Sequence, residues 1–270
     1  MTSGADWQGQ VGRSWAALYP QTDRSLSGLT ARLLERIATL AGEAILDIGC
    51  GAGELTLAVA RTRPRARIVG VDVSPELIEV AQARADRHGN VEFVVADAAS
   101  WPGDGVEPEL LISRHGMMFF DDPLRAFAHL RAIAAPGANL VFSCFRAVRE
   151  NRWAADIAEL LKLPPPPAHA PGPFAFADPQ RVEALLAEAG WSEIDCEPVD
   201  FAFVAGAGPD PLDDAVSFFH RIGPAATVLA ALEEPRRGQA EAALRRWVEA
   251  NCDGDLVAFA AAAWIVSARN

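Results

Sequence analysis

The chain has 270 residues, of which 50% are hydrophobic and 22% charged, and this balance is typical of a globular protein. Its formal net charge of −12 argues against nucleic-acid binding, because such binding depends on neutralising phosphates. No apolar run reaches the about 18 residues that favour a membrane span. The first residues also lack a basic segment followed by an apolar one, so we expect a cytoplasmic protein without a secretory signal.

The possible metal ligands are scattered along the chain. The cysteines make no C-x-x-C pair and the five histidines make no H-x-x-x-H pair. We therefore expect buried thiols rather than disulfides, and no metal site. The cysteines are Cys50, Cys144, Cys196 and Cys252.

An amphipathic helical pattern over residues 26–40 precedes the first strand and predicts a helix that packs on a sheet. Trp15 and Tyr19 come before this pattern, within an aromatic cluster. That cluster either packs in the core or forms a flap over a ligand crevice, and the sequence leaves both interpretations open.

The apolar run 44–48 predicts a strand buried on both faces. Glycines follow at every second position, including Gly49 and Gly51, and a helical pattern begins at residue 54. Strand, glycine turn and helix form the first unit of a doubly wound α/β sheet, which binds ligands at the carboxyl ends of its strands. Asp47 lies just before the turn, where a carboxylate disfavours a pyrophosphate and favours an ammonium group.

Two further acids end the next two predicted strands. Asp72 ends the strand 66–72, at about the distance along the chain where an acid binds ribose hydroxyls in nucleotide-binding sheets. Asp97 follows the strand 91–95, and it could accept a hydrogen bond from an exocyclic amine. Three acids at successive strand ends beside one glycine turn predict a single ligand site.

Two more strands, 109–113 and 139–145, complete the regular part of the pattern. Between them, Asp122 followed by proline predicts a helix cap rather than a metal ligand.

These motifs together resemble the class I S-adenosylmethionine-dependent methyltransferases, in particular a methyltransferase type 11/25-like subgroup that acts on small molecules. The resemblance covers roughly residues 30–145. It is carried by the segments Leu46–Gly53, Gly70–Ser74, Asp97–Ala98 and Ala135–Ala138.

The resemblance implies a doubly wound Rossmann-like sheet of seven strands in the order 3-2-1-4-5-7-6, with strand seven antiparallel and helical cap insertions. The runs 191–199 and 256–266 fit strands six and seven. We expect one domain over residues 1–270. Its core would comprise about 30–145, 178–200 and 255–270, and its cap or lid elements about 5–25, 146–177 and 207–253.

The same resemblance assigns the cofactor contacts. Asp47 would lie near the ammonium group, Gly49, Cys50 and Gly51 would form the turn against the methionine portion, and Asp72 would hold the ribose. The adenine would contact Val73, Asp97 and Ala98, and Arg114 would lie at the methionine end.

His115 stands where the subgroup more usually has phenylalanine, just after strand four. It is either a catalytic residue, as a general base or a polar group that positions the acceptor, or a ring that fills a phenylalanine-shaped space. The other candidates for the acceptor pocket are Trp15, Tyr19, Met118, Phe119, Trp153 and His220.

The sequence thus predicts methyl transfer from S-adenosyl-L-methionine, giving S-adenosyl-L-homocysteine, to a small, largely apolar molecule, without nucleic-acid or membrane partners. Two alternatives stay open. One is a non-catalytic cofactor-binding regulator or subunit of the same fold, and the other is a nicotinamide-dependent oxidoreductase.

Overall fold

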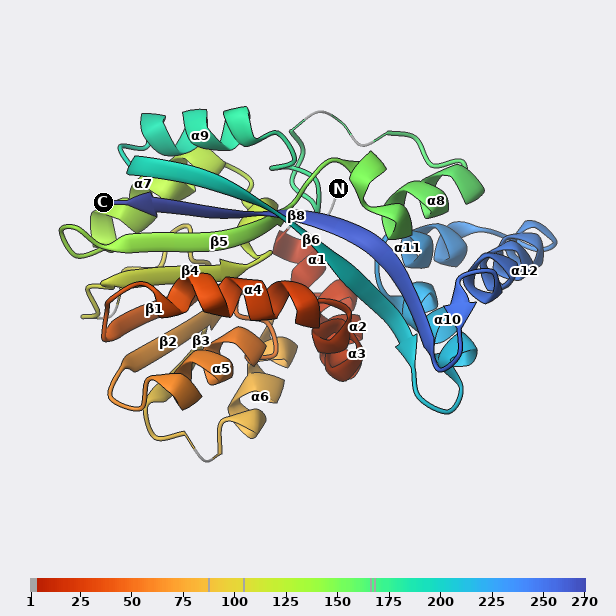
Figure 1. The fold of residues 1–270 in the computed structure, drawn as a ribbon, viewed down its shortest axis with the longest axis horizontal. Coiled ribbons are helices and arrows are strands. Elements are labelled where there is room, and N and C mark those ends of the chain that lie inside the picture. Colours follow the sequence, from red (N-terminus) through yellow and green to blue (C-terminus); the bar gives the residue numbers. More distant parts are fainter. Residues whose placement is uncertain (1–3, 87, 104, 166, 168) are drawn as a thin grey trace.

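The computed structural model describes residues 4–86, 88–103, 105–165, 167 and 169–270. Pro166 and Ala168, in the predicted cap segment 146–177, lie outside the described residues. One mixed sheet organises the molecule, with helices on both of its faces (Figure 1). Within the described part of the chain, no helix is long and apolar enough to cross a membrane.

The strand order is β3-β2-β1-β4-β5-β8-β6, which confirms the predicted topology with β8 as the antiparallel strand. β8 lies between β5 and β6 and runs antiparallel to both. A two-residue strand, β7, pairs only with β8. The strands are β1 (Ala44–Ile48), β2 (Arg67–Asp72), β3 (Val91–Val95), β4 (Leu110–Arg114), β5 (Asn139–Phe145), β6 (Ser192–Ala207), β7 (Cys252–Asp253) and β8 (Leu256–Arg269).

The strands β1 to β5 are parallel, and all of them except the edge strand β3 are largely buried because helices cover both faces. One face carries α4 (Ser27–Ala38), α5 (Glu54–Thr62) and α6 (Pro75–Arg84). The other face carries α7 (Pro123–Ile133) and α9 (Pro179–Glu188). The predicted cap at Asp122 is present, since its carboxylate accepts a hydrogen bond from the N–H of Arg125 at 3.0 Å.

The first helices lie over the carboxyl ends of the strands rather than on a face of the sheet. They are α1 (Gly4–Trp7), α2 (Gln10–Ala17) and α3 (Tyr19–Ser25). Arg13 of α2 forms an ion pair with Glu76 of α6 at 3.7 Å, and Arg24 of α3 pairs with Asp214 at 2.7 Å. These contacts hold the segment across the edge where the glycine turn lies.

β6 and β8 extend well beyond the other strands as a twisted ribbon (Figure 1). β5 pairs with β8 only over residues 263–269 of β8, so residues 256–262 pair with β6 and, at residues 256 and 257, with β7 as well. The sequence prediction ended the sixth strand at residue 199, which is too early. Phe201 and Phe203 continue the inward-facing alternation of Val199 and should have extended it.

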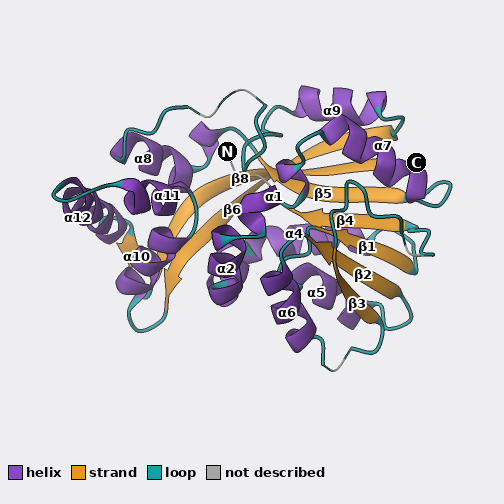
Figure 2. Ribbon diagram, turned by 180° about the vertical axis from the view of Figure 1, so that it is seen from behind, coloured by secondary structure: helices purple, strands orange, loops and turns teal. Residues whose placement is uncertain are grey.

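Helices gather around the far end of this ribbon (Figure 2). They are α8 (Arg152–Leu160), α10 (Pro211–Arg221), α11 (Pro224–Ala231) and α12 (Arg236–Glu249). Apolar side chains of the ribbon, such as Phe203 and Phe259, are buried there. Two single-turn helices lie at the sheet edge, η1 (Met117–Phe119) and η2 (Val148–Glu150).

Candidate active site

The glycine turn after β1 uses its glycines for two different purposes. Gly49 and Gly51 both have positive φ, of 62° and 55°. A Cβ on Gly49 would lie 2.8 Å from the Cα of Gly116, so this glycine lets the loops after β1 and β4 pack together. A Cβ on Gly51 would meet nothing within 4 Å. Gly51 therefore leaves backbone open to a ligand, whereas Gly49 serves the packing of the turn itself.

Asp47 is buried in β1 directly beneath this turn, with 1% of its surface exposed. Thr56 donates a hydrogen bond to its Oδ2 at 2.5 Å, while its Oδ1 has no partner among the described residues. Burial raises the pKa of Asp47 to about 7, against the opposing effects of the Thr56 hydrogen bond and the charge of Arg114. A buried acceptor without a donor is rare, and an ammonium group would supply both the donor and the compensating charge.

Asp72 fixes the turn from the neighbouring strand. Its two carboxylate oxygens accept hydrogen bonds from the N–H groups of Gly51 and Ser74, each at 2.9 Å. Burial raises its pKa, and the two backbone donors oppose that shift. Each oxygen keeps a further lone pair for a hydroxyl group, so the carboxylate can both hold the turn and bind a ribose.

The other predicted cofactor residues lie around the same edge in different environments. Cys50 is buried with Phe93, its thiol pKa is raised by burial, and its backbone N–H bonds to Val71. Val73 is half-buried. Asp97 is exposed and accepts a hydrogen bond from the N–H of Ala99 at 2.9 Å, and Ala98 is buried.

Arg114 ends β4 and is held by side chains of three other elements. Its guanidinium pairs with Glu54 of α5, donates to Thr30 of α4 at 2.9 Å, and contacts Asp23 of α3 at 3.3 Å. Burial lowers its pKa, and the Asp23 carboxylate opposes that shift. Asp23 also pairs with Arg84 at 2.9 Å. The Arg114 side chain therefore secures α3 over the sheet edge, which leaves its backbone for any ligand contact.

His115 follows immediately, and only 7% of its surface is exposed. Its Nδ1 is 3.2 Å from the hydroxyl oxygen of Ser143, and its ring centroid is 4.1 Å from that of Phe145. Burial lowers its pKa to about 3, and the nearby Arg114 charge adds to this effect. The imidazole is thus neutral at pH 7, and its Nε2 is buried without a partner among the described residues.

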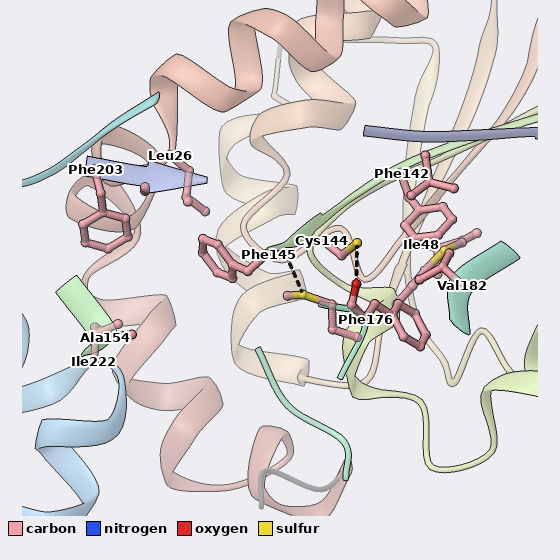
Figure 3. Packing of buried hydrophobic residues seen from close by; sticks show 14 of the residues in the cluster. Leu26, Ile48, Phe142, Cys144, Phe145, Ala154, Phe176, Val182, Phe203 and Ile222 are labelled. Carbon is pink, nitrogen blue, oxygen red and sulfur yellow. Dashed lines mark hydrogen bonds between the residues drawn. The ribbon is translucent and has the colours of Figure 1, made fainter. Parts of the chain in front are cut away.

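The candidates for the acceptor pocket fall into separate groups. Met118 and Trp153 lie beside His115, because the Met118 sulfur accepts from the N–H of Phe145 at 3.4 Å and the Trp153 ring packs on Phe145 at 5.3 Å. Figure 3 shows the Phe145 ring pointing toward Phe203 and away from Phe142.

The remaining candidates lie elsewhere. Trp15 and Phe119 both pack edge-on against Trp7, at 5.3 Å and 5.0 Å. The Tyr19 ring lies under Arg84 at 4.6 Å, beside the glycine turn. His220, in the last turn of α10, is half-buried, and its Nε2 has no partner within the described chain.

Several residues of this site were missed from the sequence. Thr56 bonds to Asp47, and Asp23 pairs with Arg84 and Arg114. His115 contacts Ser143 and Phe145. Ser143 and Phe145 lie at the carboxyl end of the fifth strand, the same edge as His115, and that position was a usable signal. The sequence holds no signal for Asp23, because its partners Arg84 and Arg114 lie far away along the chain, in α6 and β4.

Two surface hollows, of about 520 Å³ and 340 Å³, lie at the opposite edge of the sheet. Val106 and Glu107 line the first, shortly before β4 begins. Arg67 and Val91 line the second, at the first residues of β2 and β3. Neither hollow is near the glycine turn.

Comparison with known proteins finds a matching family model and similar curated proteins. Residues 45–137 match the family model described as a methyltransferase domain. A trans-aconitate 2-methyltransferase of Methylobacterium radiotolerans is 30% identical over 57% of this chain and 60% of its own length. A malonyl-[acyl-carrier protein] O-methyltransferase of Hahella chejuensis is 33% identical over 52% of this chain and 51% of its own length. The chain thus matches little more than half the length of these curated relatives.

Solved structures share the fold at lower identity. Phosphoethanolamine N-methyltransferase 2 of Haemonchus contortus, in complex with S-adenosyl-L-methionine, superposes with a TM-score of 0.58 at 14% identity. The superposition covers 100% of this chain and 60% of that one. At such identity the likeness shows the fold alone.

Proposed function

Residues 45–137 form a class I S-adenosylmethionine-dependent methyltransferase domain, and on that premise we propose that the chain methylates a small, largely apolar molecule. The domain's cofactor is S-adenosylmethionine, which supplies a methyl group on a cationic sulfur that is its own leaving group. The protein itself has to bind the cofactor and the acceptor, orient them for reaction and exclude water.

We assign the cofactor to the edge formed by the glycine turn. Asp47 would receive the ammonium group, the open backbone at Gly51 would approach the methionine portion, and Asp72 would hold the ribose. Val73, Asp97 and Ala98 would contact the adenine, and Arg114 would contribute through its backbone. The observation that carries this assignment is the partnerless Asp47 Oδ1 beside the open side of Gly51.

The apolar character of the acceptor rests on what surrounds His115. Rings follow one another from the sheet edge into the helices around the ribbon: Phe145, Trp153, Phe203 and Phe218. Their centroid separations of 5.3, 4.9 and 5.9 Å are those of packed aromatic pairs. Two relatives carry the names of methyltransferases for trans-aconitate and malonyl-[acyl-carrier protein], which supports a non-nucleic-acid acceptor.

The test uses methyl-labelled S-adenosylmethionine, purified protein and a fractionated cell extract. We expect label in the small-molecule fraction, from which the acceptor can be isolated. Label in protein or nucleic acid would contradict the substrate class while leaving the methyltransferase function intact.

The two alternatives predict other outcomes, and neither has an observation in its favour. A non-catalytic regulator would bind S-adenosylhomocysteine and transfer no label. A nicotinamide-dependent oxidoreductase would bind NAD, which the carboxylate of Asp47 beneath the turn disfavours.

A further inference from the structure

His115 is presented on a rigidly fixed turn. Its φ of 65° lies in the left-handed region, which a non-glycine residue keeps only when its surroundings fix it. Its N–H donates to the carbonyl of Ser143 at 3.2 Å, so one residue of β5 holds both the backbone and the ring. Ser113 pins the same turn, donating to the Ile48 carbonyl at 2.6 Å and accepting from the N–H of Gly116 at 3.2 Å.

We assign the proton of the His115 ring from its contact with Ser143, because the distance of 3.2 Å alone does not say which of the two atoms donates. Ser143 is fully buried, and its hydroxyl proton needs an acceptor. Nδ1 of His115 is the acceptor that the geometry provides, at 3.2 Å. Donation from Ser143 to Nδ1 places the imidazole proton on Nε2. On this assignment the buried Nε2 of His115 is an N–H donor.

Trp153 carries a second buried N–H donor, and its ring packs on Phe145 as the His115 ring does. Its indole Nε1 has no acceptor among the described residues, although only 6% of the side chain is exposed. Buried indole N–H groups normally find a partner. In this chain Trp191 donates to a carbonyl at 3.0 Å, and Trp247 donates to a carboxylate at 3.1 Å.

The two rings lie close together because both pack on Phe145. The centroid distances to Phe145 are 4.1 Å for His115 and 5.3 Å for Trp153. Both nitrogens thus belong to rings that pack on Phe145 at the carboxyl edge of the sheet, and neither has a hydrogen-bond partner within the described part of the chain.

We propose that the N–H groups of His115 and Trp153 receive a carboxylate, so that the acceptor is an apolar carboxylic acid that becomes a methyl ester. This inference rests on the proposed methyltransferase function. A donor pair binds an oxygen anion, and a nitrogen that already carries a proton takes up no other. The acceptor must therefore arrive ionised, as carboxylic acids do at pH 7 and alcohols do not.

The chemistry balances without a base. The carboxylate accepts the hydrogen bonds of the two N–H groups while one of its oxygens attacks the methyl carbon. The oxygen–carbon bond forms, the sulfur–carbon bond breaks, and its electron pair goes to sulfur. The products are the neutral ester and S-adenosylhomocysteine. In this step His115 and Trp153 bind and orient the acceptor, and Ser143 is a positioning residue that sets the tautomer.

A binding experiment tests the proposal without turnover. Protein labelled with ¹⁵N at histidine and loaded with S-adenosylhomocysteine is titrated at pH 7 with phenylacetate, and separately with 2-phenylethanol. Long-range ¹H–¹⁵N spectra should show the His115 proton on Nε2 and shift its signal with the carboxylate. We expect the carboxylate to bind at least about tenfold more tightly than the alcohol. Equal affinity, or a proton on Nδ1 in the free protein, would overturn the proposal.

Variants that remove one N–H group but keep a ring distinguish the loss of a hydrogen-bond donor from a loss of folding. Trp153→Phe and His115→Phe keep a ring and remove the N–H, so each should weaken phenylacetate binding roughly tenfold and leave S-adenosylhomocysteine affinity unchanged. Ser143→Ala should allow the His115 proton to occupy either ring nitrogen, and the same spectra report this change. Trp191→Phe is the matched control, because its indole bonds to the Phe127 carbonyl away from this ring. Carboxylate binding that survives in both phenylalanine variants would refute the assignment.

The labelled product gives a second, chemical test. Methyl esters release methanol in mild alkali, whereas methyl ethers and N-methyl or C-methyl groups do not. Label recovered as volatile methanol supports the proposal. Alkali-stable label contradicts the carboxylate while leaving the methyltransferase function standing.

Discussion

Replacing Asp47 by Asn should stabilise the free protein at pH 8 and weaken its binding of the cofactor. The carboxyl is buried, and its pKa is raised from 3.8 to about 7. The folded state therefore holds the proton more tightly than the unfolded chain does. The stability that protonation provides is complete below pH 3.8 and is lost as the pH rises through 7.

The size of the effect follows from the two pKa values. Ionising Asp47 in the folded protein costs about 4 kcal/mol above pH 7, at 1.36 kcal/mol per pH unit. An asparagine carbonyl can still accept from Thr56, but its amide would lie where Oδ1 now lacks a partner, at a cost of about 1–3 kcal/mol. The net gain at pH 8 is therefore about 1–3 kcal/mol, and it should vanish at pH 5.

Cofactor binding should change in the opposite direction. If the ammonium group requires the ionised carboxylate, the dissociation constant of S-adenosylhomocysteine should fall about 15-fold between pH 5.5 and 7, with proton release on binding. Asp47→Asn should bind more weakly at pH 7 and lose this pH dependence.

Urea unfolding at pH 5 and pH 8 and titration calorimetry of wild type and variant give all the required values. An Asn variant that is less stable than wild type at pH 8, or that binds the cofactor as tightly, would refute the reasoning.

Four further substitutions probe the glycine turn, the partners of Arg114 and the backbone around Asn151. Gly51→Ala should cost about 1 kcal/mol for its positive φ yet weaken cofactor binding at least about tenfold, whereas Gly49→Ala should lose about 3 kcal/mol or more because its methyl group would strike the next loop; urea unfolding and calorimetry compare the pair. Asp23→Ala removes a partner of the buried Arg114 and should cost about 2 kcal/mol, with faster tryptic cleavage in the first helices as the readout. The buried side chain of Asn151 donates to the carbonyls of Arg146, Ala147 and Ala262 and accepts from the N–H of Ala262. Asn151→Ala leaves these backbone groups without this partner and should lower the unfolding free energy by about 2–4 kcal/mol, and an unchanged urea midpoint would contradict this.

The sheet was predictable because its signals are local. The run 44–48 and the run 139–145 have the bounds that the pattern predicts, and Asp122 caps its helix as expected. Strand order came from the resemblance, since no single segment encodes its neighbours. The sixth strand was predicted too short because the ribbon continues beyond the sheet, where only β8 supports it.

The electrostatic details were not predictable from the sequence. The hydrogen bond between Ser143 of β5 and His115, in the turn after β4, joins residues 28 apart, and the pKa of His115 depends on burial by the whole fold. The sequence left His115 open between a base and a space-filling ring. Its neutral state and its partnerless Nε2 favour the role of a polar positioning group.

The twisted ribbon also makes the region around the acceptor exchangeable. Ala207 and Leu256 are direct partners at the end of the β6–β8 ladder, so α10, α11 and α12 leave and re-enter the sheet at one point. These three helices therefore occupy the connection between two paired antiparallel strands, as the loop of a β-hairpin does. Another segment could replace them without shifting the register of β8 beside β5, provided that it supplies a partner for Arg24, which now pairs with Asp214 of α10. Such a replacement must carry its own apolar surface, because it has to cover Phe203 and Phe259. Under the proposed function, a change of these helices would therefore alter the methyl acceptor and keep the residues that we assign to the cofactor.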